Sequence, residues 1–178
     1  MILQKRVILG LLMLLLLATV VLISLCAIRM HSKKSSVEIS KFIKQDDLRD
    51  LSLTIYYMSP FILTRKPISD TDLAGGLYEY KVTIPGRILG EHIDLLNKMI
   101  ETDLEPVTKG SHLNARIYYV FETKKDDKIF SVSMWGENNS MFVNGHEVKE
   151  NKAFYDIIMP FLPENAVQEL QTYLDQGK

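Results

Sequence analysis

The pattern of hydrophobic and polar residues divides the chain into three parts. Residues Val7 to Ile28, "VILGLLMLLLLATVVLISLCAI", form a run of 22 residues without a charge. As a helix rising about 1.5 Å per residue, this run spans roughly 33 Å and matches a bilayer hydrocarbon core of about 30 Å. We therefore expect a transmembrane segment within residues 1–28, a polar, basic juxtamembrane stalk over 29–47 and one folded domain over 48–178.

Three fates of the apolar run are consistent with its sequence. A cleaved signal peptide has a shorter apolar region, about 7–15 residues, followed by small residues at the cleavage positions, which Ser24 and Cys26 fill poorly. A lipoprotein signal would use Cys26 in "ISLC", but Leu25 stands where a small residue is expected. The length favours a retained single-pass anchor. A six-residue basic stub before a long apolar run is the usual layout of a signal-anchor whose downstream domain is exported, so we expect an extracytoplasmic domain. The basic residues after the run favour the opposite orientation by the positive-inside tendency.

Alternation of period two predicts strands in the first part of the domain. Leu51 to Tyr57 and Tyr78 to Ile84 each place apolar residues at every second position. Between them, Ser69 and Asp72 are spaced as a helix capping box, and Gly75-Gly76 would end a helix of little more than one turn. The expected order is therefore strand, short helix, strand.

A helical period follows, and then several consecutive strands. Residues 87–101 carry an apolar stripe typical of an amphipathic helix. Alternating segments from Leu113 onward are separated by "KKDD", "GENN" and Asn144-Gly145, and the last pair is preferred in two-residue hairpin turns. Asn151 is placed to cap a final helical region interrupted by prolines. This order predicts an α+β domain, with an antiparallel β-meander and helices packed on one face.

Charge and cysteine content narrow the possible functions. Beyond residue 28 the chain has 19 basic and 22 acidic residues, a formal charge of −3. Proteins that bind nucleic acid usually carry a basic excess, so a nucleic-acid partner is disfavoured. The single cysteine, Cys26, lies inside the apolar run, which leaves the domain without a disulfide or a catalytic thiol.

Sequence motifs for catalysis or cofactor binding are absent from the chain. "HEVKE" at 146–150 resembles the zinc-protease pattern H-E-x-x-H, but Glu150 stands where the second histidine is required. There is no G-x-S-x-G elbow, phosphate loop or dinucleotide fingerprint. We therefore predict a non-enzymatic domain without a metal or cofactor. The alternative is an envelope hydrolase or metal-dependent enzyme whose site is assembled from dispersed histidines and carboxylates.

Aromatic residues on the strands provide a candidate interaction surface. "IYY" occurs at 55–57 and again at 117–119, and neighbouring residues of a strand point to opposite faces. If helices cover one face, Tyr56, Tyr118 and Trp135 would form an exposed platform for a peptide, glycan or protein partner. If other segments cover the second face as well, the same rings belong to a core.

Two long segments resemble a known group of proteins. These are "LTIYYMSPFILTRKPIS" and "RIYYVFETKKDDKIFSVSMWGENNSMFVNGHEVKENKAFYDIIMPFLP". Over roughly residues 48–175 they are similar to small membrane-anchored proteins of Gram-positive bacteria (Firmicutes) that carry an extracytoplasmic domain of unknown function. The resemblance implies a cell-envelope setting, and it transfers no catalytic residue to this chain. We expect a binding or sensory domain, or alternatively an immunity or accessory protein that docks on a membrane transporter.

Overall fold

A computed structural model describes residues 48–107, 110–125, 127–136 and 140–176, together with Met13 and Thr19. Apart from those two residues, which are helical, the predicted transmembrane segment Val7 to Ile28 and the stalk lie outside the described residues. Within the described part, no helix combines the length and the apolar character needed to cross a membrane. The anchor therefore stays a prediction from sequence.

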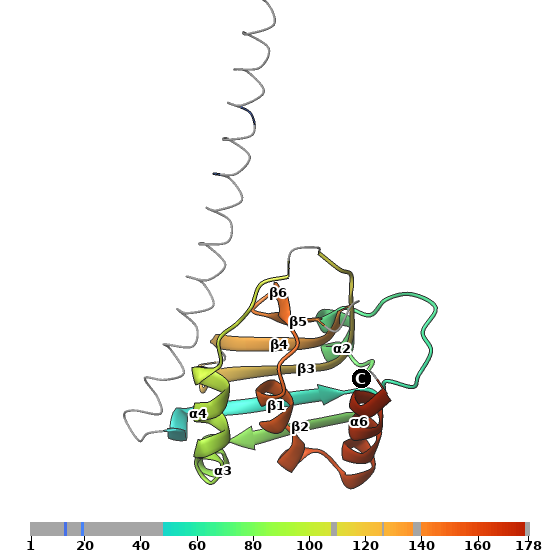
Figure 1. The fold of residues 1–178 in the computed structure, drawn as a ribbon. Coiled ribbons are helices and arrows are strands. Elements are labelled where there is room, and N and C mark those ends of the chain that lie inside the picture. The colour runs from blue at the N-terminus through green and yellow to red at the C-terminus, as the bar shows by residue number, and fades with distance from the viewer. Residues whose placement is uncertain are drawn as a thin grey trace, which may run out of the picture.

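The domain is built on a six-stranded antiparallel sheet with strand order β2-β1-β3-β4-β5-β6 (Figure 1). The last four strands form the predicted meander, and β1 lies between β2 and β3. The strand bounds are β1 Leu51–Tyr57, β2 Tyr80–Pro85, β3 Leu113–Thr123, β4 Lys128–Gly136, β5 Ser140–Val143 and β6 His146–Lys149.

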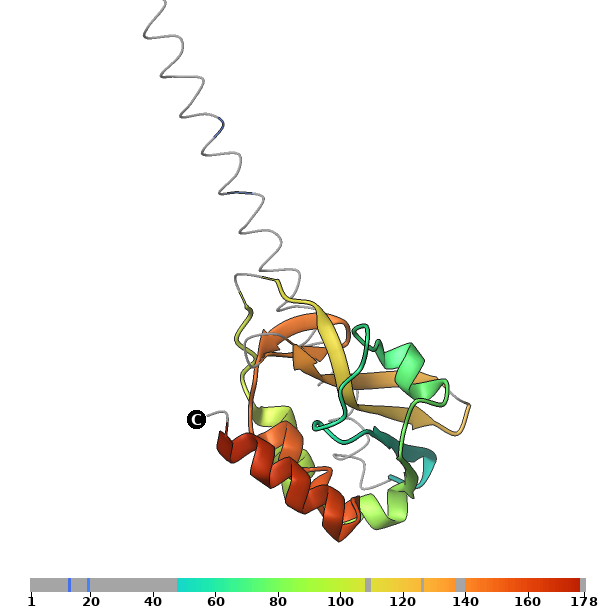
Figure 2. The same cartoon turned by 90° about the vertical axis from the view of Figure 1, so that its right-hand side faces the viewer.

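Helices lie on both faces of this sheet. The helical elements are η1 Leu48–Asp50, α2 Asp70–Ala74, α3 Gly86–Gly90, α4 Ile93–Glu101, α5 Ala153–Asp156, η2 Met159–Phe161 and α6 Glu164–Gln176. Residues of α3 to α6 pack with one sheet face into the main core. On the other face α2 packs against β1 and β3, and Figure 2 shows it across the sheet from α6.

The α+β class and the antiparallel meander are confirmed, whereas the placement of all helices on one face is wrong. The helix on the second face has the predicted capping box, in which Ser69 and Asp72 each accept a hydrogen bond from the other's backbone N–H. Ile68 and Leu73 are both buried there and belong to the same second core. The short helix α2 therefore places apolar side chains on the sheet face that the sequence analysis had expected to be free of helices.

The helix predicted over 87–101 is two helices, α3 and α4, separated at Glu91 and His92. In this break, the N–H groups of Glu91 and His92 donate to Ile88 and Leu89, which are the tighter i to i−3 bonds. Gly90, a poor helix former, directly precedes the break. The apolar stripe survives the break, because its central residues on both helices are buried in the main core.

The predicted hairpin turn is confirmed, whereas the N-cap of α5 is Lys152, one residue after the predicted Asn151. Asn144 and Gly145 both have positive φ, 50° and 78°, as a two-residue hairpin turn between β5 and β6 requires. The Asn151 side chain accepts a hydrogen bond from the N–H of Ala153 at 3.0 Å, at the start of α5. The helical region after it is interrupted at Pro160, in η2, and at Pro163, before α6.

Candidate functional site

Tyr118, the central residue of the predicted aromatic platform, is buried. It is 9% exposed and belongs to the second core. Its ring stacks on Tyr56 at 5.8 Å between centroids with 20° between the planes, and Tyr56 in turn meets Tyr78 edge-on at 5.5 Å. Burial raises the pKa of the Tyr118 phenol to about 12. Tyr56 is half-buried beside it, so little of this ring cluster faces solvent.

Trp135 lies on the opposite face of the sheet from Tyr118. The pairing of β3 and β4 and that of β4 and β5 both shift register near this residue, and its φ is +88°. A bulge of this kind re-aims a side chain. The indole packs edge-on against Tyr173 of α6 at 4.5 Å and Tyr155 of α5 at 6.4 Å, in the main core.

The three rings therefore do not form one exposed platform, and the structural basis of that prediction is wrong. Tyr56 and Tyr118 are covered by α2 and the residues that lead into it, and Trp135 contacts the helices on the other side. Alternation along a strand assigned Trp135 to the face of Tyr118, but the bulge reverses that assignment. Gly136, directly after Trp135, is the one local signal that could have indicated this bulge.

Exposed hydrophobic residues are concentrated instead in the segment between β1 and α2. We call residues 59–67, "SPFILTRKP", the apolar loop. Its residues Phe61, Ile62 and Leu63 are 48%, 38% and 98% exposed. Our sequence prediction missed this site. The signal was three consecutive large apolar residues between two prolines, in a segment with neither strand nor helix periodicity.

Arg116, a buried residue of β3, holds the backbone of the apolar loop in place. It is 5% exposed, and its guanidinium donates to the Ile62 carbonyl at 3.1 Å and to the Thr64 hydroxyl at 3.4 Å. A second guanidinium nitrogen donates to the Asn114 side chain at 2.7 Å. At the start of the loop, the Ser59 N–H donates to the Glu79 carboxylate at 2.7 Å. Loop conformation is thus built into the fold.

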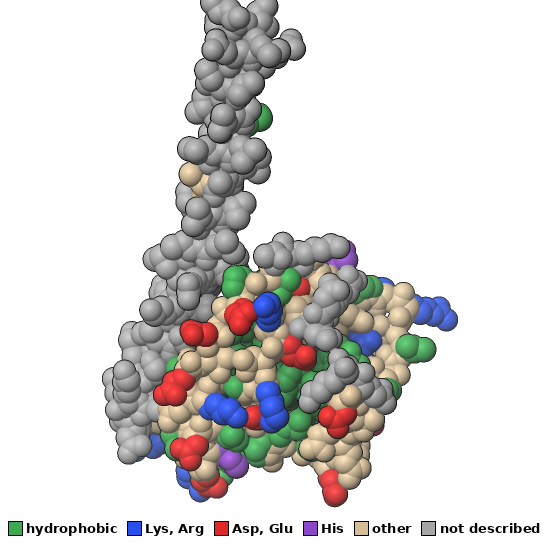
Figure 3. All heavy atoms as spheres, in the orientation of Figure 1, with side chains coloured by type: hydrophobic (Ala, Val, Ile, Leu, Met, Phe, Trp, Pro, Cys, Tyr) green, Lys and Arg blue, Asp and Glu red, His purple; other side chains and the backbone are tan. Residues whose placement is uncertain are grey.

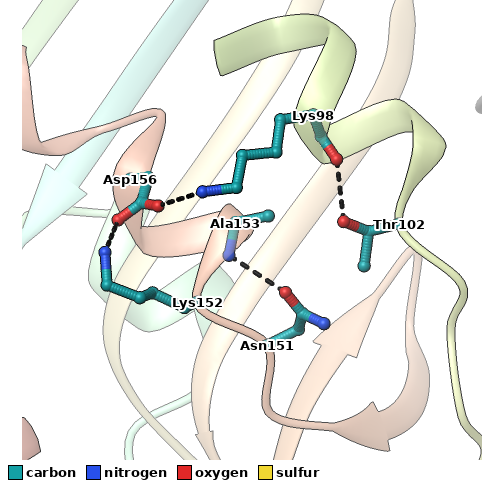
Figure 4. Close-up of polar contacts among 6 residues, drawn as sticks. All are labelled: Lys98, Thr102, Asn151, Lys152, Ala153 and Asp156. Atoms are coloured by element: carbon teal, nitrogen blue, oxygen red, sulfur yellow. Dashed lines mark hydrogen bonds and ion pairs between the residues drawn. The ribbon is translucent and has the colours of Figure 1, made fainter.

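A cluster of charged residues joins α4 to α5 on the surface (Figure 4). Lys98 Nζ lies 3.0 Å from Asp156 Oδ2, Lys152 contacts the other carboxylate oxygen, and Thr102 donates to the Lys98 carbonyl at 2.8 Å. Burial raises the pKa of Asp156, but the contacts with both lysines outweigh it and hold the pKa below its usual value. The ionised Asp156 carboxylate therefore links α4 to α5, and each of its two oxygens is engaged by a lysine instead of serving as a nucleophile or base.

The segment that resembled a zinc-protease motif is the edge strand β6, as expected after a hairpin turn. Glu147 accepts hydrogen bonds from the Ser111 N–H at 2.8 Å and the Ser140 hydroxyl at 2.5 Å. Burial raises its pKa, but the hydrogen bonds from these two serines outweigh it and lower the pKa. Among the residues that the structure describes, no three potential ligands from histidine, cysteine, aspartate and glutamate are placed to hold a metal ion.

Comparison with known proteins identifies no relative, since no family model, no curated protein and no solved structure matches this chain.

Proposed function

We propose that the protein is a single-pass, membrane-anchored binding or accessory domain of the bacterial cell envelope, without catalytic activity and with its domain outside the cytoplasm. The observation that carries the proposal is the run of 22 uncharged residues from Val7 to Ile28, which has the length and composition of a membrane span. The exposed apolar loop supports the proposed binding role of the domain, because contiguous exposed apolar residues mark interaction sites.

Structural roles of three carboxylates support the proposal that the domain is not an enzyme. Asp156 is paired with two lysines, Glu147 accepts from two serines, and Glu169 accepts from the Tyr57 hydroxyl at 3.0 Å. Catalytic acids and bases generally have a pKa shifted toward the working pH. The pKa values of Asp156 and Glu147 are lowered instead, away from neutrality.

The anchor is tested by expressing the full chain in a bacterial host and separating membranes from soluble protein. The chain is expected to have intact mass and to stay in membranes through high-salt and alkaline washes, because a hydrophobic span is not released by either. Cys26→Ser should behave identically, since the thiol is then only a small apolar group within the span. A soluble product beginning near Ala27, or a lipid-modified Cys26 at a new amino terminus, would replace the retained anchor with a cleaved signal or a lipoprotein.

Orientation and chemistry need separate measurements. Protease added outside intact cells stripped of their wall should digest the domain, and its survival would place the domain in the cytoplasm. Metal analysis of the purified full chain is expected to show no stoichiometric metal. A bound transition metal would favour the alternative of a metal-dependent envelope enzyme.

A further inference from the structure

We propose that the apolar loop inserts into the lipid headgroup region of the membrane that holds the chain, and that its basic residues favour anionic lipid. This inference rests on the proposed function, because the loop needs a bilayer within reach of the domain. The contact would be a second attachment point, separate from the transmembrane segment.

The exposure of the loop is the first argument. Leu63 is 98% exposed and follows Phe61 and Ile62, which are also exposed, so three large apolar side chains meet water in succession. Figure 3 shows hydrophobic and basic side chains protruding together on the right-hand side, where the loop lies in Figure 1. Large exposed apolar groups at a protruding tip mark a surface that is covered in use.

The basic residues beside the tip of the loop indicate that the loop contacts lipid. Arg65 and Lys66 follow the apolar residues and are exposed, and residues 59–67 contain no acidic side chain. Apolar side chains next to cations are the composition of segments that lie in the interface of anionic membranes. A stable protein interface buries at least about 1,200 Å² in total, more than three side chains at one tip supply, whereas a membrane contact has no such minimum.

The apolar loop is also held in one conformation by contacts within the domain. Besides the bonds from Arg116, the Ile62 N–H donates to the Ser59 carbonyl at 3.2 Å, and the Phe61 ring packs edge-on against Tyr173 of α6 at 6.4 Å. Insertion of a loop already held in one conformation loses less conformational entropy than insertion of a free segment.

The geometry of the tether allows both attachments at once. The chain enters β1 through η1, and the apolar loop begins just beyond the other end of β1, so about 23 Å of strand separates the two points. Residues 29–47 supply 19 residues between the apolar run and the domain, with a maximum reach of roughly 65 Å when extended. The two contacts together would fix the tilt of the domain on the membrane.

The test uses the full chain with Cys26→Ser, reconstituted into vesicles of phosphatidylcholine with or without phosphatidylglycerol. A polarity-sensitive fluorophore is attached to Leu63→Cys or, as the matched control, to Asp94→Cys, an exposed position on α4. We expect a blue-shifted emission and protection from aqueous dithionite for the Leu63→Cys label alone. Both effects should be larger with phosphatidylglycerol and should decrease in Arg65→Gln/Lys66→Gln. Fluorescence of Trp135, the only tryptophan, verifies that the fold is unchanged.

The result that overturns the inference is a Leu63→Cys label as accessible to dithionite as the Asp94→Cys label in both kinds of vesicle. Flotation of the same vesicles after an alkaline wash separates this failure from a failure of the proposed function. A chain that floats with the lipid while its loop label stays in water overturns the lipid contact alone. A chain that the wash releases overturns the anchor, and the inference that rests on it fails with it.

Discussion

Tyr118 and Trp135 show how a single residue can be assigned to the wrong surroundings. Both were predicted to share an exposed face, yet Tyr118 is packed under α2 and Trp135 reaches Tyr155 and Tyr173 on the other side of the sheet. For Tyr118, the cover is a segment distant in sequence. For Trp135, the cause is its own backbone, which leaves the strand conformation at φ +88°.

The burial of Tyr118 leads to a prediction about stability. Tyr118→Ala should lower the free energy of unfolding by about 3–5 kcal/mol, because truncation of a buried aromatic side chain leaves a cavity. The loss should appear as a lower denaturation midpoint of the full chain in detergent. Tyr118→Phe is the matched control, since it keeps the ring stacked on Tyr56. A loss of less than about 1 kcal/mol for the alanine variant, the range of surface substitutions, would show that the ring is exposed after all.

At the scale of elements, α2 shows how the domain stabilises a helix of only five residues. Such a segment is too short to be stable alone, so its ends and its packing must hold it. The capping box satisfies backbone donors at its start, and Leu73, with no exposed surface, fixes it to the second core. The helix in turn covers Tyr118, so the cap affects the burial of the sheet face.

Removal of the cap is therefore expected to weaken the second core. Ser69→Ala should lower the free energy of unfolding by about 0.5–2 kcal/mol, the usual cost of losing a side-chain N-cap. Ser69→Thr, which keeps a capping hydroxyl, should lose much less. An alanine variant as stable as the original chain would mean that packing alone holds α2.

Ser69→Ala should also change the pKa of Asp72. Hydrogen bonds from the Ser69 hydroxyl and backbone N–H lower the pKa of Asp72. A lowered pKa in the folded state stabilises the fold above the ordinary aspartate value, and this contribution is lost as the pH falls through the folded value. In Ser69→Ala the pKa of Asp72, followed by NMR, should rise toward its ordinary value. An unchanged pKa would show that the hydroxyl does not bind this carboxylate.

At the scale of the whole molecule, buried phenols make the fold sensitive to alkali. Burial is the main cause that raises the pKa of Tyr57, Tyr119 and Tyr155 well above the usual value, and it raises that of Tyr118 to about 12. Nearby Glu169 and Glu150 raise the pKa of Tyr57 and Tyr155 further. An unfolded tyrosine ionises near pH 10. Each of these groups therefore has a higher pKa folded than unfolded, and its contribution is fully present below pH 10.

We expect the domain to lose stability steeply as the pH rises from about 10 through 12, because the unfolded chain releases phenol protons that the folded chain retains. Phenolate absorbance and circular dichroism of the full chain in detergent should change together, in one cooperative step. Phenolate formation near pH 10 by all the tyrosines, without loss of structure, would contradict this. In the alkaline wash, the domain should unfold while the predicted transmembrane segment, Val7 to Ile28, keeps the chain in the membrane.

Sequence by itself determined the elements and turns whose causes are local. Period-two alternation located the strands, because successive side chains of an extended chain point to opposite faces. Ser69 and Asp72 located a helix start and Asn144-Gly145 located a hairpin, because each depends on bonds or backbone angles of residues close in the chain. The apolar run at the amino terminus is likewise a property of sequence, from its length and lack of charge.

Only the tertiary structure decided which of these elements cover which surfaces. The burial of Tyr118 and the outward display of Phe61 to Leu63 both depend on packing between elements. The loop, for example, is held by Arg116 from a position 54 residues away from Ile62. Such contacts depend on the three-dimensional path of the chain, and periodicity along the sequence carries no information about that path.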